Sequence, residues 1–261
     1  MNQIKHQVRF PEGSSDLRNQ EYFFATHEGK EHKYHLQQYE DVFNVPGLYE
    51  AVTTKLKYQS PATVAMQLIA QVIKAKSDID SLIVLEIAAG TGFAGKELAS
   101  LGVKSIVGVD IIPEAAEAAQ RDYPGVYDKY YVEDLVNITP ATYKALVERD
   151  FNCLMCCSSL SCHFPVQGFI NSFNLIQTDG WIVFNVSTYI IEDTEDEESF
   201  EYKKAVEFRQ LYLYMIKVGI LEVTNKHYYL HRLLTNGTPL NYVAVTARKR
   251  SNISENWLEC I

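Results

Sequence analysis

Residues 82–95 read LIVLEIAAGTGFAG and decide the fold class of this chain. An apolar run contains a carboxylate, Glu86, and leads into a turn that holds Gly90, Gly92 and Gly95. Glycines let the backbone approach a ligand closely, and a helix after such a turn offers unpaired N–H groups at its N-terminus. The stretch therefore predicts a strand, a glycine-rich loop and a helix that together bind a nucleotide.

Two nucleotide cofactors compete for this loop. The spacing Gly90-x-Gly92-x-x-Gly95 matches the dinucleotide fingerprint, and Asp110 follows at the distance of a ribose-binding acid. Glu86, however, would place a negative charge beside a pyrophosphate. S-Adenosylmethionine has no phosphate and carries a sulfonium and an ammonium group, which an acid attracts. The residues favour S-adenosylmethionine, although Glu86 could instead pair with N–H groups of the loop, and Asp110 could cap the next helix.

A set of ordered motifs supports the same choice. The stretch Val84–Gly92 resembles the first motif of class I S-adenosylmethionine-dependent methyltransferases, with Ala88 in place of the motif's first glycine. Four later stretches resemble further motifs of this family in the same order: residues 106–110, 131–135, 151–160 and 180–186. Several ordered matches are more specific than one loop. An NAD-dependent oxidoreductase therefore ranks behind a methyltransferase.

The resemblance implies roles for individual residues. Asp110 would bind the ribose, Ile111 would pack on the adenine, and Asp134 would accept a hydrogen bond from the adenine amino group. The implied cofactor is S-adenosyl-L-methionine, and the product is S-adenosyl-L-homocysteine. The implied cofactor site consists of Glu86, Ala88, Gly90, Gly92, Asp110, Ile111, Glu133, Asp134, Leu135 and Ser158.

A narrower resemblance involves two segments outside the glycine-rich loop. Residues 49–61 (YEAVTTKLKYQSP) and 158–165 (SSLSCHFP) are similar to segments of the Williams–Beuren-type methyltransferase-like proteins. This resemblance places Tyr58 and His163 in the wall of the site. His163 is the candidate general base, because it follows a strand at the edge where open α/β sheets bind ligands. The alternatives are a histidine that caps the following helix or lines the pocket passively.

Aromatic and acidic residues mark the predicted acceptor side. Tyr49, Tyr58 and Tyr189 are candidate walls for the acceptor, with simple packing as the alternative for each. Residues 191–201 carry seven acids, which could attract a cationic amine towards the site. We prefer the interpretation that these acids form a solvated helix start, where negative charge is favourable.

The pattern along the chain predicts an α/β protein with a doubly wound, Rossmann-like sheet. Ser60-Pro61 is expected to cap and begin the first core helix. Later helices are expected to begin at Pro113, at Thr139-Pro140 and near residue 167. The resemblance implies seven strands in the sheet. The expected buried stripe of the first core helix is Val64, Leu68, Ile69, Val72 and Ile73.

The end of the chain predicts a C-terminal antiparallel hairpin. Two strand-like runs, residues 221–234 and 240–248, flank the turn Asn236-Gly237, and a helix over 200–218 precedes them. We divide the chain into an N-terminal arm or lid (1–45), a class I methyltransferase domain (46–250) and a tail (251–261).

The expected arm is irregular or partly helical, because it is polar and aromatic and lacks aliphatic periodicity. Its histidines, His27, His32 and His35, do not have the spacing of a common metal site. We therefore expect them on the surface or as caps.

Length and composition limit the class of protein. The 261 residues, 47% hydrophobic and 22% charged, suit one α/β domain with an added arm. The N-terminus lacks the pattern of a signal peptide and no apolar run is as long as a membrane span, which favours a cytoplasmic protein. A net charge of −9 without a basic stripe argues against nucleic acid and anionic membranes as partners. Four of the five cysteines lie within residues 153–162 without a second ligand pair, so we expect packing residues and no metal.

The expected activity is transfer of a methyl group from S-adenosylmethionine to an oxygen or nitrogen of a small-molecule acceptor, by in-line displacement. A general base is needed only if the acceptor keeps its proton until transfer. The alternative from another class is a scaffold that binds S-adenosylmethionine without catalysis and acts through the arm. The sequence indicates neither the acceptor nor the oligomeric state.

Overall fold

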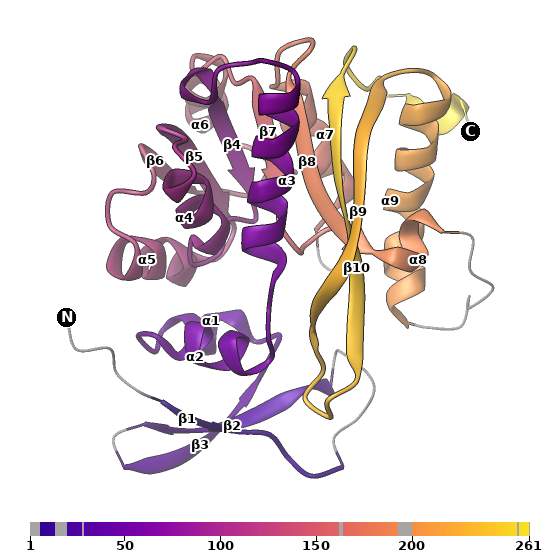
Figure 1. Ribbon diagram of the computed structural model, residues 1–261. Helices are drawn as coiled ribbons and strands as arrows, with labels where there is room; N and C mark the ends of the chain where they lie inside the picture. Colours follow the sequence, from indigo (N-terminus) through magenta and orange to yellow (C-terminus); the bar gives the residue numbers. More distant parts are fainter. Residues whose placement is uncertain are drawn as a thin grey trace.

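Seven strands form the main sheet, in the order β6-β5-β4-β7-β8-β10-β9 (Figure 1). The computed structural model describes residues 6–13, 20–27, 29–161, 164–192, 200–254 and 256–260. The first five strands in this order are parallel, and the last two are antiparallel to their neighbours. The predicted doubly wound sheet and C-terminal hairpin are thereby confirmed. The strands are β4 (Ile83–Ile87), β5 (Ser105–Asp110), β6 (Lys129–Val132), β7 (Cys153–Cys156), β8 (Trp181–Ser187), β9 (Leu221–Leu233) and β10 (Pro239–Lys249).

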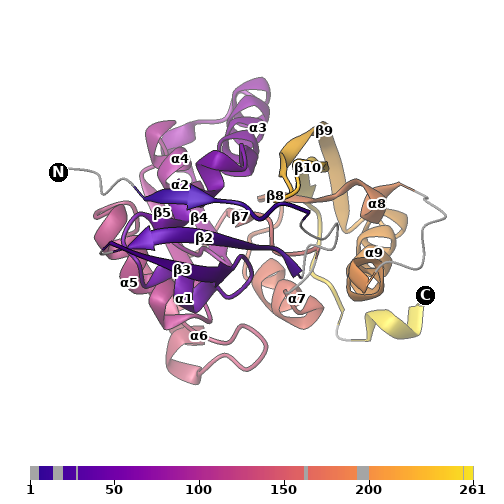
Figure 2. The ribbon, with the colours of Figure 1, turned by 90° about the horizontal axis from the view of Figure 1, so that it is seen from below.

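Helices cover both faces of this sheet (Figures 1 and 2). On one face, α3 and α4 pack against the inner strands through one apolar cluster. On the other face, α6, α7 and α9 contribute to a larger cluster, because their apolar stripes face the sheet. These helices are α3 (Ser60–Lys74), α4 (Phe93–Ser100), α5 (Pro113–Asp122), α6 (Pro140–Val147), α7 (Val166–Asn174), α8 (Thr188–Ile191) and α9 (Phe200–Lys217), with short 3₁₀ helices at Ile79–Ser81 and Trp257–Cys260.

The start of α3 corrects one prediction. The helix begins at Ser60 with Pro61 in its first turn, as expected, but Ser60 does not cap it. Gln59 occupies the cap position. The Ser60 hydroxyl is buried and lies within hydrogen-bond distance of Tyr229 and His231, which are on β9. The prediction of a buried Ile73 is also wrong: this residue is 60% exposed, because it lies at the edge of the apolar stripe, near the end of the helix.

The N-terminal region is a small sheet, which corrects the expectation of an irregular or partly helical arm. Strands β1 (Gln7–Arg9), β2 (Tyr22–His27) and β3 (Lys30–His35) pair antiparallel in that order. The sequence pattern for these strands is weak, because β3 is mostly charged and exposed and β2 buries only alternate residues such as Phe23 and Ala25.

Two short helices join the small sheet to α3. They are α1 (Tyr39–Phe43) and α2 (Leu48–Lys55), and both contribute to one hydrophobic cluster with β2. We call residues 6–56, as far as they are described, the N-terminal unit. It lies across the carboxyl ends of the parallel strands (Figures 1 and 2).

The long β9–β10 hairpin reaches from the main sheet to the N-terminal unit (Figure 1). Leu233 N donates to Leu56 O at 2.7 Å, at the end of the unit, and Gln59 N, in the link to α3, donates to His231 O at 2.9 Å. The hairpin therefore closes one side of the space above the strand ends.

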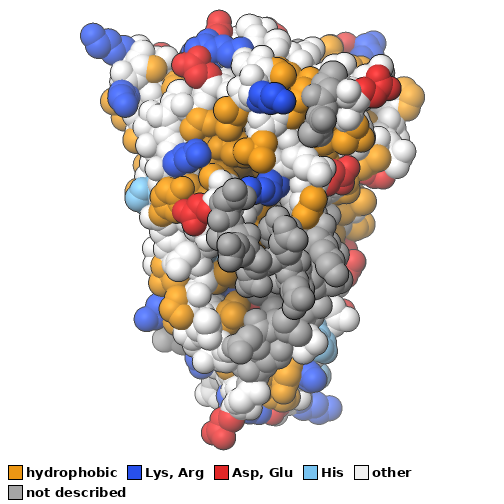
Figure 3. All heavy atoms as spheres, turned by 90° about the vertical axis from the view of Figure 1, so that its right-hand side faces the viewer, with side chains coloured by type: hydrophobic (Ala, Val, Ile, Leu, Met, Phe, Trp, Pro, Cys, Tyr) orange, Lys and Arg blue, Asp and Glu red, His pale blue; other side chains and the backbone are white. Residues whose placement is uncertain are grey.

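The face of α9 that points away from the main sheet is exposed. Figure 3 shows apolar side chains among charged ones on this side of the molecule. Leu213 and Ile216 of α9 are 46% and 40% exposed, and Val218, just after the helix, is 50% exposed. Among the described residues, none of the helices combines the length and apolar character needed to span a membrane.

Candidate functional site

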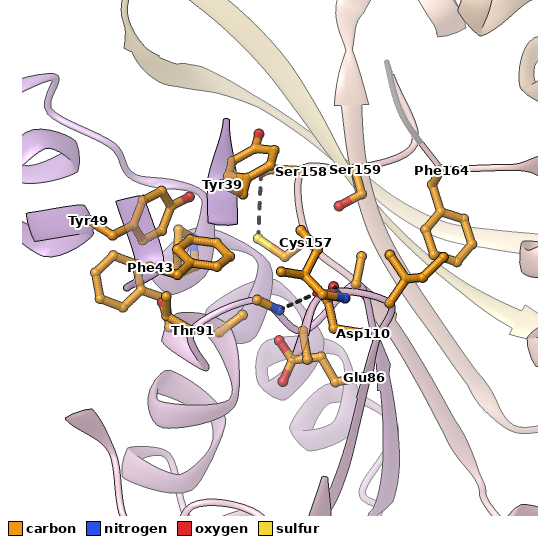
Figure 4. Close-up of a pocket in the computed structure, with 18 of the residues that line it drawn as sticks. Tyr39, Phe43, Tyr49, Glu86, Thr91, Asp110, Cys157, Ser158, Ser159 and Phe164 are labelled. Atoms are coloured by element: carbon orange, nitrogen blue, oxygen red, sulfur yellow. Dashed lines mark hydrogen bonds between the residues drawn. The ribbon is translucent and has the colours of Figure 1, made fainter. Parts of the chain in front are cut away.

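A cavity of about 270 Å³ lies between the carboxyl ends of the parallel strands and the N-terminal unit. The glycine-rich loop, the acids near the ends of β4 and β5 and the two acids after β6 line one side of it. In Figure 4 the aromatic side chains of Tyr39, Phe43 and Tyr49 lie together, apart from Glu86 and Asp110. The cavity thus has an acidic half at the sheet and an aromatic half at the N-terminal unit.

The loop after β4 is held in a tight conformation by side chains from neighbouring strands. Asp110 accepts hydrogen bonds from Gly90 N at 2.8 Å and from Ile112 N at 3.0 Å. Tyr130 Oη donates to Gly90 O at 2.7 Å. Ala88 has a φ of +50°, a left-handed conformation that favours glycine. The strained backbone explains why the resemblance expects a glycine at position 88.

Glu86 is buried beneath this loop, with 1% of its surface exposed. Tyr127 Oη donates to its Oε2 at 2.9 Å. Burial, together with the nearby Asp110, raises the pKa of Glu86 to about 8, against the hydrogen bond from Tyr127. Burial also raises the pKa of Asp110, and hydrogen bonds from backbone N–H groups oppose that rise. The fold therefore confines two acids where a cationic ligand would stabilise their charged forms.

Gly95, the third glycine of the fingerprint, makes room for Tyr127 and does not line the cavity. A Cβ at this position would lie 2.6 Å from Tyr127 Oη and 2.8 Å from Glu86 Oε2. Gly108 on β5 has a similar place, because its Cβ would lie 2.9 Å from the Tyr127 ring. Gly95 and Gly108 leave room for Tyr127 beside Glu86. The third glycine of the fingerprint is therefore explained by the packing of Tyr127 and not by the approach of a pyrophosphate.

Eleven of the predicted site residues line the cavity, namely the cofactor-side Glu86, Ala88, Gly90, Asp110, Ile111, Glu133, Asp134, Leu135 and Ser158, and the acceptor-side Tyr49 and Tyr58. The predicted cofactor residue Gly92 does not line the cavity. It is the N-cap residue of α4, with a φ of +92°. Ile111 is apolar yet 63% exposed, as a surface for a flat ligand would be.

The Asp134 carboxylate already has local partners. It accepts from Val136 N and from Asn137 Nδ2, both at 2.8 Å, and these bonds lower its pKa. Glu133 accepts from Thr139 Oγ1 at 2.7 Å. A carboxylate has lone pairs for further donors, so the adenine contact remains a prediction for Asp134.

One predicted acceptor-side residue, Tyr189, lies away from the cavity. Tyr189 does not line the cavity; it lies in α8 and packs against the large core cluster, because the chain turns away from the cavity after β8. His163 lies outside the described residues, as do residues 193–199 of the acidic segment. In the described part of the chain, no group of three or more His, Cys, Asp or Glu side chains is arranged to hold a metal ion.

A buried polar network connects two residues that line the cavity, Ser158 and His231. Asn185 Oδ1 accepts from Ser158 N at 2.7 Å, and Asn185 Nδ2 lies 3.0 Å from Ser60 Oγ and 2.8 Å from Tyr229 Oη. Ser60 Oγ lies 2.6 Å from His231 Nδ1. Separate elements of the fold thereby contribute side chains to one network.

Sequence reasoning missed the residues that the N-terminal unit and the hairpin bring to the cavity. No local motif contains them, because they come from segments with ordinary packing patterns. These residues include Tyr39, Phe43, His231, Arg232, Leu240 and Tyr242. Thr53, Phe93 and Cys157 also line the cavity; they lie within stretches that the sequence analysis quoted, but were not predicted as site residues. For Tyr127 and Tyr130 a signal did exist, since two tyrosines precede the predicted third motif.

Comparison with known proteins supports the fold. No protein-family model and no curated protein matches the sequence. Similar solved structures include S-adenosylmethionine-dependent methyltransferases from Anabaena variabilis (14% identity, TM-score 0.51, covering 82% of this chain and 95% of that chain) and Clostridium acetobutylicum (14%, 0.50, 78% and 98%). A candidate RNA methyltransferase from Pyrococcus horikoshii is also similar (14%, 0.50, 74% and 86%). This chain has the Rossmann-like fold that these methyltransferases share.

Proposed function

We propose that this protein binds S-adenosylmethionine and transfers its methyl group to a small-molecule acceptor. The observation that carries the proposal is the pair of buried acids, Glu86 and Asp110, beside a glycine-rich loop at the carboxyl ends of adjacent strands. The shared fold with methyltransferases supports the same choice.

The residues present fit this cofactor better than a dinucleotide. Among the described residues that line the cavity, the single Lys or Arg is Arg232, which bonds to Glu21 and not to the loop. A pyrophosphate at the loop would therefore face Glu86 and Asp110 without a cation. A sulfonium and an ammonium group would instead be attracted by both acids.

Each part of the site has a role in this proposal. Asp110 would bind the ribose, Ile111 would contact the adenine, and Glu86 would stabilise positive charge from beneath the loop. The bound cofactor supplies an electrophilic methyl carbon. The N-terminal unit covers the strand ends and excludes water, which favours alignment of the acceptor for in-line displacement.

The first test is calorimetric titration of the protein with S-adenosylmethionine, S-adenosylhomocysteine and NADH. We expect micromolar binding of the first two and none of NADH. The variants Glu86→Gln and Asp110→Asn should each weaken binding at least tenfold. Glu148→Gln is the matched control, because Glu148 is exposed on the surface, where it pairs with Lys144. Binding of NADH alone would overturn the proposal.

The acceptor class needs a separate test. Turnover would be followed with tritiated S-adenosylmethionine and panels of phenols, amines and carboxylic acids, with total RNA as a further arm. The net charge of −9 favours the small molecules over RNA. Methylation of RNA alone would contradict the small-molecule part of the proposal and leave the cofactor part intact.

A further inference from the structure

We propose that His231 accepts the proton of an aromatic hydroxyl group on the acceptor, and that Ser60 and Asn185 hold its ring for this task. The inference rests on the proposed function, because it concerns the acceptor half of the same cavity. It makes the reaction an O-methylation and assigns the base to the C-terminal hairpin.

His231 lies on β9, lines the cavity and is 5% exposed. Its ring stacks on Tyr242 of β10, with 3.8 Å between centroids and planes 10° apart. The Tyr58 ring contacts the imidazole edge-on, with centroids 5.2 Å apart. The backbone carbonyl of His231 accepts from Gln59 N, so main chain and side chain are both fixed.

A line of hydrogen bonds connects this ring with the end of β7. Nδ1 lies 2.6 Å from Ser60 Oγ, Asn185 Nδ2 lies 3.0 Å from the same oxygen, and Asn185 Oδ1 accepts from Ser158 N. When Nδ1–H donates to Ser60, Nε2 is the basic nitrogen of the imidazole. Ser158 is a predicted cofactor residue. The network therefore connects His231 by hydrogen bonds to the cofactor side of the cavity.

The other titratable groups around the ring do not serve as the base. They are Tyr58, Tyr229 on β9, Tyr242 on β10, Cys157 after β7, and the Arg232–Glu21 ion pair. Burial raises the pKa of Cys157 to about 12, and it also raises the pKa of Tyr58 and Tyr229, so these groups keep their protons at neutral pH. Imidazole is the side chain suited to accept a proton near neutral pH.

The lining of this half indicates the acceptor class. Its walls are aromatic, which suits a planar ring through stacked and edge-on contacts. Arg232 is the one Lys or Arg in the described lining, and Glu21 and the carbonyl of Leu233 already accept its hydrogen bonds. A carboxylate acceptor would have no further cation to pair with. The aromatic side chains of this half are Tyr39, Phe43, Tyr49, Tyr58, Phe93 and Tyr242.

Atoms and electrons balance in the proposed step. The acceptor O–H bond breaks and its proton goes to Nε2 of His231, which becomes an imidazolium. The acceptor oxygen forms a bond to the methyl carbon, while the bond from that carbon to sulfur breaks and leaves its electron pair on the sulfur. The products are an aryl methyl ether and S-adenosylhomocysteine, and the imidazolium returns its proton to solvent.

4-Nitrophenol is the probe for this inference, because its absorbance reports ionisation without turnover. It would be titrated with pH in the complex of the protein with S-adenosylhomocysteine, after calorimetry has shown that S-adenosylhomocysteine binds. We expect bound nitrophenol to ionise at least about one pH unit below the free probe, which is a tenfold change. His231→Gln should remove this shift, and Ser60→Ala should reduce it. His227→Gln is the matched control, since His227 lies exposed on the same strand.

Each outcome has a defined meaning. If wild-type protein binds S-adenosylhomocysteine but not nitrophenol, or binds nitrophenol without the shift, the inference is wrong and the proposed function stands. An unchanged shift in His231→Gln overturns it as well. If the panels show methylation of amines and not of phenols, the acceptor class is wrong. Failure to bind S-adenosylhomocysteine would instead refute the proposed function.

Discussion

Glu21 and Arg232, which are 211 positions apart, form a buried ion pair between the N-terminal unit and the β9–β10 hairpin. Two bonds join the side chains, at 3.0 Å and 2.5 Å, and Glu21 also accepts from Thr235 N at 2.8 Å. The Glu21 side chain is 0% exposed and that of Arg232 is 10% exposed. This ion pair and the two backbone hydrogen bonds of residues 231 and 233 hold the N-terminal unit and the β9–β10 hairpin together beside the cavity.

Loss of one partner of this pair should destabilise the protein strongly. Glu21→Gln leaves the Arg232 cation buried without a counter-charge, which costs about 3–5 kcal/mol in comparable pairs. Urea unfolding monitored by circular dichroism measures the change. Glu31→Gln is the control, because its ion pair with Arg9 is exposed and should contribute about 1 kcal/mol or less. Equal effects of the two substitutions would mean that the buried pair does not fasten the unit.

Glu86 should make the stability of the ligand-free protein depend on pH. Its pKa rises from 4.5 to about 8 on folding, so the folded state holds a proton that the unfolded state has lost. The advantage of that proton is complete below pH 4.5 and is lost as pH rises through 8. Relative to Glu86→Gln, wild-type protein should therefore become less stable between these pH values, by at most about 1.4 kcal/mol per pH unit. Thermal unfolding at a series of pH values tests the trend; parallel curves would contradict it.

Binding of a cationic cofactor should release the same proton. At pH 7 Glu86 is mostly protonated in the free site, and a nearby positive charge favours the carboxylate. Calorimetry of S-adenosylmethionine binding in buffers of different ionisation enthalpy measures the number of protons released. We expect net release by wild-type protein and its loss in Glu86→Gln. Net proton uptake would show that the bound ligand does not place positive charge near this acid.

Gly95→Ala should destabilise the protein because of Tyr127, not because of a ligand. Its Cβ would meet Tyr127 Oη at 2.6 Å and Glu86 Oε2 at 2.8 Å. Overpacking of this kind costs about 1–3 kcal/mol. In the double variant Gly95→Ala/Tyr127→Leu the two effects should be much less than additive, since the ring that clashes is gone. Additive effects in unfolding experiments without ligand would show that Gly95 does not make room for Tyr127.

Lys249 should act as a buried cap for the end of α7. Its ammonium donates to the carbonyls of Phe173, Asn174 and Ile176, and the residue is 1% exposed. Lys249→Met would leave these carbonyls without their donor and should cost about 1–3 kcal/mol. The exposed Lys104→Met, which loses a surface ion pair with Asp80, is the comparison and should cost less. Matching losses in urea unfolding would exclude the capping role.

Local patterns in the sequence were enough to predict the central fold. Each βα unit carries its own signals: an apolar strand, a turn and the start of a helix, which is marked by proline at Pro113 and Pro140 and by glycine before α4. The loop from Glu86 to Gly92 and the acid at Asp110 could be placed at one sheet edge, because parallel strands end together. The acidic half of the cavity was therefore predictable.

The aromatic half was decided by tertiary structure. His231 and Arg232 lie on a strand whose sequence predicts only a hairpin, and their partners Ser60 and Glu21 are 171 and 211 positions away. Ser60 illustrates the limit: before Pro61 it has the sequence of a helix cap, yet its hydroxyl bonds to His231. The sequence by itself determined the features that depend on contacts within one βα unit. Contacts between distant segments depend on how the N-terminal unit and the hairpin dock, and only the folded chain brings their side chains together.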